Sequence, residues 1–194
     1  MPETRSSAPL VWIDCEMTGL DYENDEIISI ACFVTDADLN TLDDVGYVAV
    51  IHQPKEIMDR MGEWCTRQHG ASGLTQAVLA SHLSSDKAAS ELFDYIQKFC
   101  PGRREALLAG NSVHADRAFL RREPYKKIIS HLHHRIFDVS SIKEAMRRWS
   151  PMEVVNGSPM KRGLHDAKAD ILESIAEAKY YRQTLFLKES STFA

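Results

Sequence analysis

The pattern of hydrophobic positions begins with strand-like segments and then alternates between helical and strand-like segments. Residues 10–13 form a short apolar run, and residues 26–36 are almost continuously apolar with many β-branched side chains, as in a central strand covered on both faces. Further strands are expected at residues 45–53, 105–111 and 134–140. Three strands followed by alternating helices and strands predict an α/β fold with a mixed five-stranded sheet flanked by helices.

Helical patterns fill most of the remaining chain. They are expected at residues 58–70, 84–100, 115–132 with an interruption near Pro124, 141–149 and 166–185. Residues 150–165 have two Pro, two Gly and no apolar period, so a loop is expected there. In the last helix, Leu172, Ile175, Ala176 and Tyr180 are expected to share the apolar face.

Length and composition are ordinary for one globular domain. The chain has 194 residues, 44% of them hydrophobic and 26% charged. We expect a single domain over residues 10–187, with residues 1–9 and 188–194 as disordered tails. No apolar run could cross a bilayer, and the first nine residues contain no secretory signal. The four cysteines include no C-x-x-C pair, so reduced thiols in the core of an intracellular protein, cytoplasmic or mitochondrial, are expected.

Two carboxylates interrupt the first strand pattern. Asp14 and Glu16 follow the apolar run at positions i and i+2, so they project from the same face of a strand. Two neighbouring carboxylates repel each other and raise one pKa unless a cation lies between them. The alternative is a frayed strand end whose acids face solvent. Gly19 predicts a sharp turn soon afterwards, which places the pair at a sheet edge, where α/β proteins hold their sites.

Other candidate residues lie far along the chain. Asp116 follows the fourth strand at the start of a helix, where an acid also has a purely helix-stabilising role. Asp170 lies in the first turns of the last helix, where a solvated position is the alternative. His165 precedes it by five residues, which on a continuous helix would put the two about 140° apart. If His165 instead ends the preceding loop, it can approach a site that Asp170 helps to form.

Four carboxylates and one histidine are suited to metal-assisted phosphoryl chemistry. Carboxylate oxygens are the ligands that Mg²⁺ and Mn²⁺ prefer, and Mg²⁺ commonly binds substrate phosphate as well. Two such ions about 4 Å apart activate a water and stabilise the leaving oxygen. A neutral histidine nearby can accept the proton of that water.

Five segments together resemble one nuclease family. They are WIDCEMTGLD, MGEWCTRQHGASGLT, GNSVHADRAFL, RIFDVSSIKEAMRRW and HDAKADILESIAEAKYYR. In this order they resemble the oligoribonucleases, which are 3′-to-5′ exoribonucleases of the DEDDh type. The resemblance implies a ribonuclease H-like fold, two bound Mg²⁺ or Mn²⁺ ions and a homodimer. It also implies hydrolysis of very short RNA, notably dinucleotides, to nucleoside 5′-monophosphates.

The resemblance also assigns individual residues. Asp14, Glu16, Asp116 and Asp170 match the metal-binding acids, and His165 matches the general base. Substrate-binding positions are matched by Leu20, a wedge between two bases, by Trp64 and His69, which line the pocket, and by Ser112, Arg135 and Ser140, which cap the 5′ phosphate. Arg135 and Ser140 are expected to come from the partner subunit. His134 replaces the tyrosine that the family has before this arginine, so weaker or pH-dependent substrate binding is expected.

Net charge limits the kind of nucleic acid that the protein can hold. At −5 it argues against a broad basic surface for long RNA or DNA, because such binding depends on neutralising many phosphates. Two alternatives to a short-RNA exoribonuclease are a 3′-to-5′ exonuclease on longer RNA or DNA and a module that binds short RNA without turnover. Trp149 is compatible with a dimer interface and equally with packing inside the chain.

Overall fold

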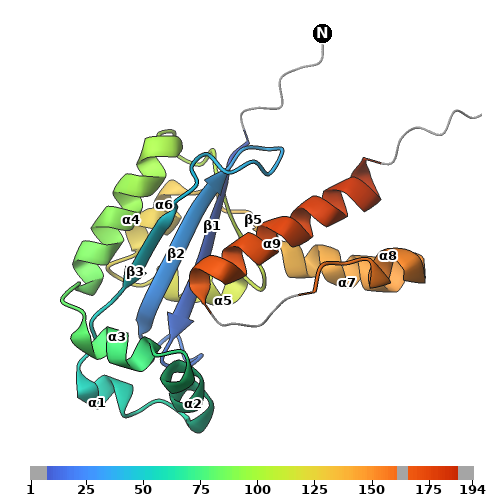
Figure 1. Ribbon diagram of the computed structural model, residues 1–194. Helices are drawn as coiled ribbons and strands as arrows, with labels where there is room; N and C mark the ends of the chain where they lie inside the picture. Colours follow the sequence, from blue (N-terminus) through green and yellow to red (C-terminus); the bar gives the residue numbers. More distant parts are fainter. Residues whose placement is uncertain (1–7, 161–165, 188–194) are drawn as a thin grey trace, which may run out of the picture.

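A five-stranded mixed sheet forms the centre of the molecule (Figure 1). The structure, a computed structural model, describes residues 8–160 and 166–187, so the expected tails lie almost entirely outside the described residues. The strands, in the order β3-β2-β1-β4-β5, are β3 (Tyr47–Val50), β2 (Ile27–Thr35), β1 (Leu10–Met17), β4 (Leu107–Gly110) and β5 (Ile136–Asp138). β2 is antiparallel to β1 and β3, while β1, β4 and β5 are parallel. The mixed sheet predicted from the sequence is confirmed.

β1 is longer than its apolar run. It continues to Met17, so Asp14 and Glu16 lie within the strand and pair with β2 rather than following a frayed end. On its other side, β1 pairs with β4 only through residues 10–12. The last part of β1 therefore extends past the end of β4, which leaves room for side chains from elsewhere beside its acids.

The helices cover both faces of the sheet and one end. They are α1 (Lys55–Met58), α2 (Glu63–Ala71), α3 (Leu74–Ala80), α4 (Ser85–Phe99), α5 (His114–Leu120), α6 (Lys126–His131), α7 (Val139–Trp149), α8 (Met152–Asn156) and α9 (Ala167–Tyr181), and α9 continues into a π-helical turn, η1 (Arg182–Phe186). The helix expected over residues 58–70 corresponds to α2 but begins later than expected, at Glu63, because Met58 ends the separate short helix α1. A helix was not expected at α3, and α8 lies in the segment expected to be a loop.

Alternate side chains of β1 enter two different cores. Val11, Ile13 and Cys15 pack in the core beneath α4, α5 and α6, whereas Trp12 packs in the core beneath α7 and α9. All nine residues of β2 are buried, as expected for a central strand. α9 crosses one face of the sheet (Figure 1). Trp12 packs on that face, and Asp14 and Glu16 follow it at i+2 and i+4, so their side chains project from the same face.

The apolar face of α9 differs from the expected one. Ile171, Ile175, Ala178 and Tyr181 are buried, whereas Leu172 is 42% exposed. Ser174 and Glu177 are also buried on this face, at 4% and 1% exposure. These two polar residues interrupt the apolar stripe, so hydrophobicity alone pointed to a neighbouring face of the helix.

The cysteines agree in part with the expectation of reduced core thiols. All four are free; Cys15, Cys32 and Cys100 are buried, whereas Cys65 is only partly buried. Within the described residues, no helix is both long and apolar enough to cross a membrane.

Candidate metal centre and substrate cavity

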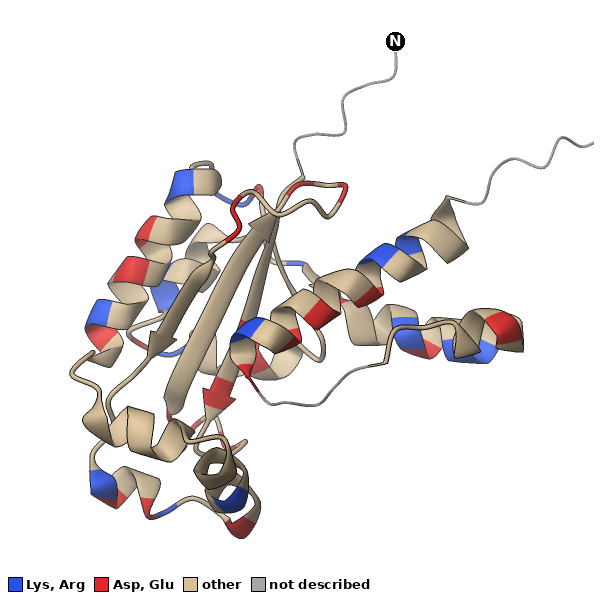
Figure 2. Cartoon of the chain, in the orientation of Figure 1, with Lys and Arg blue, Asp and Glu red and all other residues tan. Residues whose placement is uncertain are grey.

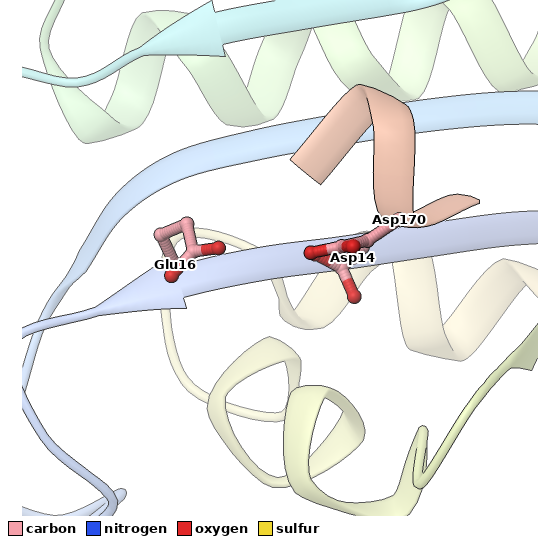
Figure 3. A group of neighbouring side chains, drawn as sticks. All are labelled: Asp14, Glu16 and Asp170. Carbon is pink, nitrogen blue, oxygen red and sulfur yellow. The ribbon is translucent and has the colours of Figure 1, made fainter. Parts of the chain in front are cut away.

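Three carboxylates from two elements meet at the end of β1 (Figure 3). Asp14 and Glu16 project from the same face of β1, and Asp170 lies in the first turn of α9 above it. One ligand oxygen from each lies within 4.8 Å of the others. Asp166 begins α9 by accepting a hydrogen bond from the Ala169 N–H at 2.8 Å, which fixes the first turn that carries Asp170.

The charge of this group is concentrated in a partly buried position. Burial, followed by the nearby charges of Asp170, Asp116 and Asp166, raises the pKa of Glu16 from 4.5 to about 8. β2, β3 and β4 carry no charged residue, so the acids at the end of β1 stand out in the charge distribution (Figure 2). A cation between the carboxylates would oppose this repulsion. The set of oxygen ligands fits Mg²⁺ or Mn²⁺.

Asp116 lies close to this group but has a different local role. Its Oδ1 accepts a hydrogen bond from the Cys15 backbone N–H at 2.9 Å, and the side chain is buried in the first turn of α5. Burial raises the pKa of Asp116 to about 7, against the opposing effect of the Cys15 hydrogen bond. β4 does not pair with this part of β1, so Asp116 provides the acceptor that a longer β4 would have provided.

A cavity of about 770 Å³ opens beside the carboxylates. Its lining includes Leu20, Trp64 and His69, together with Asp14, Glu16 and Asp170. Leu20 is 81% exposed and Trp64 is 52% exposed, so both present apolar surface to a ligand. His69 is buried, and its Nε2–H donates to the Met17 carbonyl at 3.0 Å while its Nδ1 lies 4.0 Å from Glu16 Oε2. His69 therefore connects α2 to the end of β1.

The loop that carries Leu20 is held by side chains not anticipated from the sequence. Asp25 accepts hydrogen bonds from the Thr18 hydroxyl at 2.8 Å and the Asp21 N–H at 2.9 Å. Arg122 donates to the carbonyls of Tyr22 and Asp25, both at 2.7 Å. No sequence pattern indicates this contact, because Arg122 lies about a hundred residues further along the chain.

A second polar group lies at the carboxyl ends of β4 and β5. Ser112 has a left-handed backbone with φ of 51°, and its N–H donates to Ser140 Oγ at 2.9 Å and Asp138 Oδ1 at 3.0 Å. The Oγ atoms of Ser112 and Ser140 are 3.2 Å apart. Ser140 therefore reaches Ser112 within one chain, and the expectation that Ser140 comes from the partner subunit is not needed for the two serines to act together.

The remaining predicted residues are not all placed with this group. His134 and Arg135 precede β5, at the opposite end of that strand from Ser140, and both are exposed. The ring of His134 lies 4.2 Å from that of His133. His165 lies outside the described residues.

Comparison with known proteins identifies the family. The family model described as Exonuclease (RNase_T) matches residues 11–178. The chain is 48% identical to the mitochondrial oligoribonuclease of Saccharomyces cerevisiae over 185 residues, which cover 92% of this chain and 68% of that one. It is 50% identical to an oligoribonuclease of Mycobacterium sp. (strain KMS), covering 92% and 81% of the two chains. This chain belongs to the exonuclease family, among the oligoribonucleases. The nuclease class expected from the sequence is thereby confirmed: the protein is a metal-dependent exoribonuclease.

Solved structures confirm the fold of this exonuclease. Escherichia coli Exonuclease I in complex with a dT13 oligonucleotide superposes with a TM-score of 0.69 at 18% identity, covering 92% of this chain and 41% of that one. Exonuclease I from Methylocaldum szegediense gives a TM-score of 0.66 at 17% identity, with the same coverage. The exonuclease thus spans about two fifths of these chains and shares their ribonuclease H-like core.

Proposed function

We propose that this exonuclease removes nucleotides from the 3′ end of very short RNA, notably dinucleotides, and releases nucleoside 5′-monophosphates. The observation that carries the proposal is the convergence of Asp14, Glu16 and Asp170 beside a cavity lined by exposed Leu20 and Trp64. Relatives named oligoribonuclease support RNA as the substrate.

Two divalent ions, Mg²⁺ or Mn²⁺, fit the residues present. Asp14, Glu16 and Asp170 would hold one ion, and Asp14 with Asp116 would hold the second. When bound, such ions supply an activated water and neutralise charge on the scissile phosphate. The raised pKa of Glu16, caused first by burial and then by the neighbouring carboxylates, supports this assignment, because a cation among these acids would stabilise their ionised form.

The general base of the proposed reaction is His165. A histidine can accept the proton of the attacking water at neutral pH. The proposal for His165 depends on its place in the family's motif, five residues before Asp170. The aspartates and Glu16 would bind the metal ions and so orient the substrate phosphate, and His165 accepts the proton of the attacking water.

The cavity suits a small ligand better than a long strand. Its volume of about 770 Å³ lies within the range of small-molecule sites. Trp64 would stack on a base, a contact worth about 1–3 kcal/mol, and Leu20 would insert between the two bases of a dinucleotide. His69, buried against Glu16, would fix the wall of the pocket next to the scissile phosphate.

A cap on the 5′ phosphate would restrict substrate length. Because β1, β4 and β5 are parallel, their carboxyl ends lie at the same end of the sheet. Ser112 and Ser140 therefore lie at the same end of the sheet as the carboxylates. Arg135 and His134 lie beyond the start of β5, roughly 10 Å of strand away from Ser140. Their position supports a contribution from a partner subunit to the cap of its neighbour.

A homodimer is the proposed assembly. Trp149 is 81% exposed and Phe186 is 69% exposed, and together with Ile142 and Ala145 they line an apolar hollow between α7 and η1. Exposed apolar surface of this kind is typical of protein interfaces. The mitochondrial relatives, from yeast and from Homo sapiens at 44% identity, support a mitochondrial location for the dimer.

A second candidate is a 3′-to-5′ exonuclease on longer RNA or DNA. The Exonuclease I complexes show that this fold also accommodates longer DNA. The net charge of −5 opposes such a role, because long nucleic acid is held mainly by neutralising phosphates.

A chain-length series separates the two candidates. We would incubate 5′-labelled RNAs of two, three, five and about twenty nucleotides with Mg²⁺, Mn²⁺ or EDTA. Rapid metal-dependent release of mononucleotide from the shortest RNA, falling steeply with length, is expected. Processive shortening of the longest RNA would contradict the cap and favour the second candidate.

A further inference from the structure

Glu177 is a buried carboxylate outside the metal centre. It is 1% exposed on α9, where an ionised group is costly unless it is paired. It accepts hydrogen bonds from Tyr181 Oη at 2.6 Å and Asn111 Nδ2 at 3.0 Å, and Lys143 Nζ lies 3.1 Å away. Although burial acts to raise the pKa of Glu177, these hydrogen bonds and the Lys143 charge lower it, so the carboxylate is ionised at neutral pH.

Asn111 connects this carboxylate to the serine pair. Its Nδ2 donates to Glu177 Oε2 and to Ser174 Oγ, the latter at 2.8 Å, while its Oδ1 accepts from Ser140 Oγ at 3.0 Å. The two acceptors beside Nδ2 fix the orientation of the amide, so its oxygen faces Ser140.

The direction of these hydrogen bonds gives the two serines different roles. The hydroxyl proton of Ser140 is donated to Asn111, so Ser140 Oγ faces Ser112 as an acceptor and receives its N–H. The Ser112 hydroxyl then has a proton that it can donate either to Ser140 or to a ligand. Ser112 is therefore the member of the pair whose hydroxyl proton is available to a ligand, and Ser140 accepts the Ser112 backbone N–H and holds it in place.

The same face of α9 carries a metal ligand. Asp170, Ser174 and Glu177 are spaced at i, i+4 and i+7, and Ser174 Oγ donates to the Asp170 carbonyl at 2.8 Å. Lys143 adds a connection from α7, the helix that carries Ser140 in its first turn. The serine pair is thus tied to the helix face that holds Asp170.

We infer that Glu177, Asn111 and Lys143 are positioning residues that fix the distance between the carboxylate centre and the Ser112–Ser140 pair, and thereby set the preference for short 5′-phosphorylated substrates. The inference depends on the proposed function, because the distance matters only if the serine pair binds the 5′ phosphate of the RNA cut at the carboxylates.

The test compares two dinucleotides that differ only in the 5′ phosphate. In Glu177→Gln, an uncharged amide replaces the carboxylate that accepts the hydrogen bond of Asn111 Nδ2. This change disturbs the position of Asn111 and, through it, that of Ser140. KM for the 5′-phosphorylated dinucleotide should rise roughly tenfold, the loss expected for one or two weakened hydrogen bonds. KM for the 5′-hydroxyl dinucleotide and kcat for both should stay within about twofold of wild type.

Controls separate positioning from folding. Glu91→Gln, a matched change on α4 beside Lys87, should leave both KM values unchanged. Lys143→Met, at a position whose side chain is 37% exposed, should show a smaller rise for the phosphorylated substrate alone, and it keeps the test valid if Glu177→Gln does not fold. Equal changes for both substrates, or none in either variant, would overturn the inference.

Wild-type behaviour separates the inference from the proposed function. If wild type cuts neither dinucleotide, the proposed function fails. If it cuts both and prefers the phosphorylated one, but the variants keep that preference, only the positioning role fails. A wild type indifferent to the 5′ phosphate would refute both the cap and the positioning role.

Discussion

Asp116 accepts a hydrogen bond from the backbone N–H of Cys15, 101 residues away, at 2.9 Å. Cys15 lies between the two acids Asp14 and Glu16, in the part of β1 that does not pair with β4. Asp116 of α5 therefore provides the acceptor for this backbone N–H. The side chain that we propose as a support for a metal ion therefore also satisfies a buried backbone donor.

Two substitutions of Asp116 separate these roles. Asp116→Asn keeps an oxygen acceptor for the Cys15 N–H, whereas Asp116→Ala leaves that donor unsatisfied. We expect Asp116→Ala to have an unfolding free energy lower than that of Asp116→Asn by about 1–3 kcal/mol in urea titrations. Both variants should lose most nuclease activity. Equal stability of the two would show that the hydrogen bond contributes little.

The metal-free protein should lose stability as pH rises. The pKa of Glu16 is raised from 4.5 to about 8 and that of Asp116 from 3.8 to about 7, so the folded state binds these protons more tightly than the unfolded state. This contribution to stability is fully present below the unfolded pKa values and is lost as pH rises through the folded ones. In EDTA, the melting temperature should fall by several degrees between pH 5 and pH 8.

Metal and a single substitution provide the controls for this prediction. Mg²⁺ should raise the melting temperature more at pH 8 than at pH 6, because it binds the ionised carboxylates. Glu16→Gln should flatten the dependence in EDTA. A melting temperature that is constant or rises up to pH 8 would contradict the electrostatic description of the site.

Trp64 should contribute to substrate binding and little to stability. Its side chain is 52% exposed beside the cavity, so Trp64→Ala should leave the melting temperature nearly unchanged. KM for a dinucleotide should rise about tenfold or more, as expected for the loss of one stacked base, while Trp64→Phe keeps most of the effect. A large fall in stability without a change in KM would identify Trp64 as a packing residue.

His134 offers a test of the contribution from the partner subunit. A histidine can carry charge at pH 6 but a tyrosine cannot, and the tyrosine ring is larger with a different reach. His134→Tyr should therefore lower KM for a dinucleotide and reduce its change between pH 6 and pH 8. If His134→Tyr has the same KM as wild type at both pH 6 and pH 8, His134 does not contact the substrate.

The sequence predicted the parts of the site that depend on local periodicity. Strand alternation was enough to put Asp14 and Glu16 on one face, and Asp116 was correctly expected at a helix start. Asp170 meets these two acids only because α9 crosses the sheet face on which Trp12 packs. This crossing is a tertiary contact, and no local pattern in the sequence indicates it.

Other features could not be predicted because polar residues serve inside the fold. Glu177 and Ser174 lie on the buried face of α9, so the apolar stripe was assigned one position away. Pro151 and Gly157 suggested a loop, yet they stand at the beginning and end of the short helix α8. α9 also carries Asp170 and Glu173, and nothing in the sequence distinguishes the buried Glu177 from these acids, so the Asn111 network had no local signal.

The most direct test of the metal centre uses Asp170→Asn. Wild type and variant would be freed of metal with EDTA, mixed with a 5′-phosphorylated dinucleotide, and assayed after addition of Mg²⁺. We expect Mg²⁺ to restore cleavage by wild type and not by Asp170→Asn, although the variant keeps the wild-type melting temperature or exceeds it because one like charge is removed. Cleavage by the variant at the wild-type rate, or metal-independent cleavage by wild type, would contradict the assignment of Asp14, Glu16 and Asp170 as the metal centre.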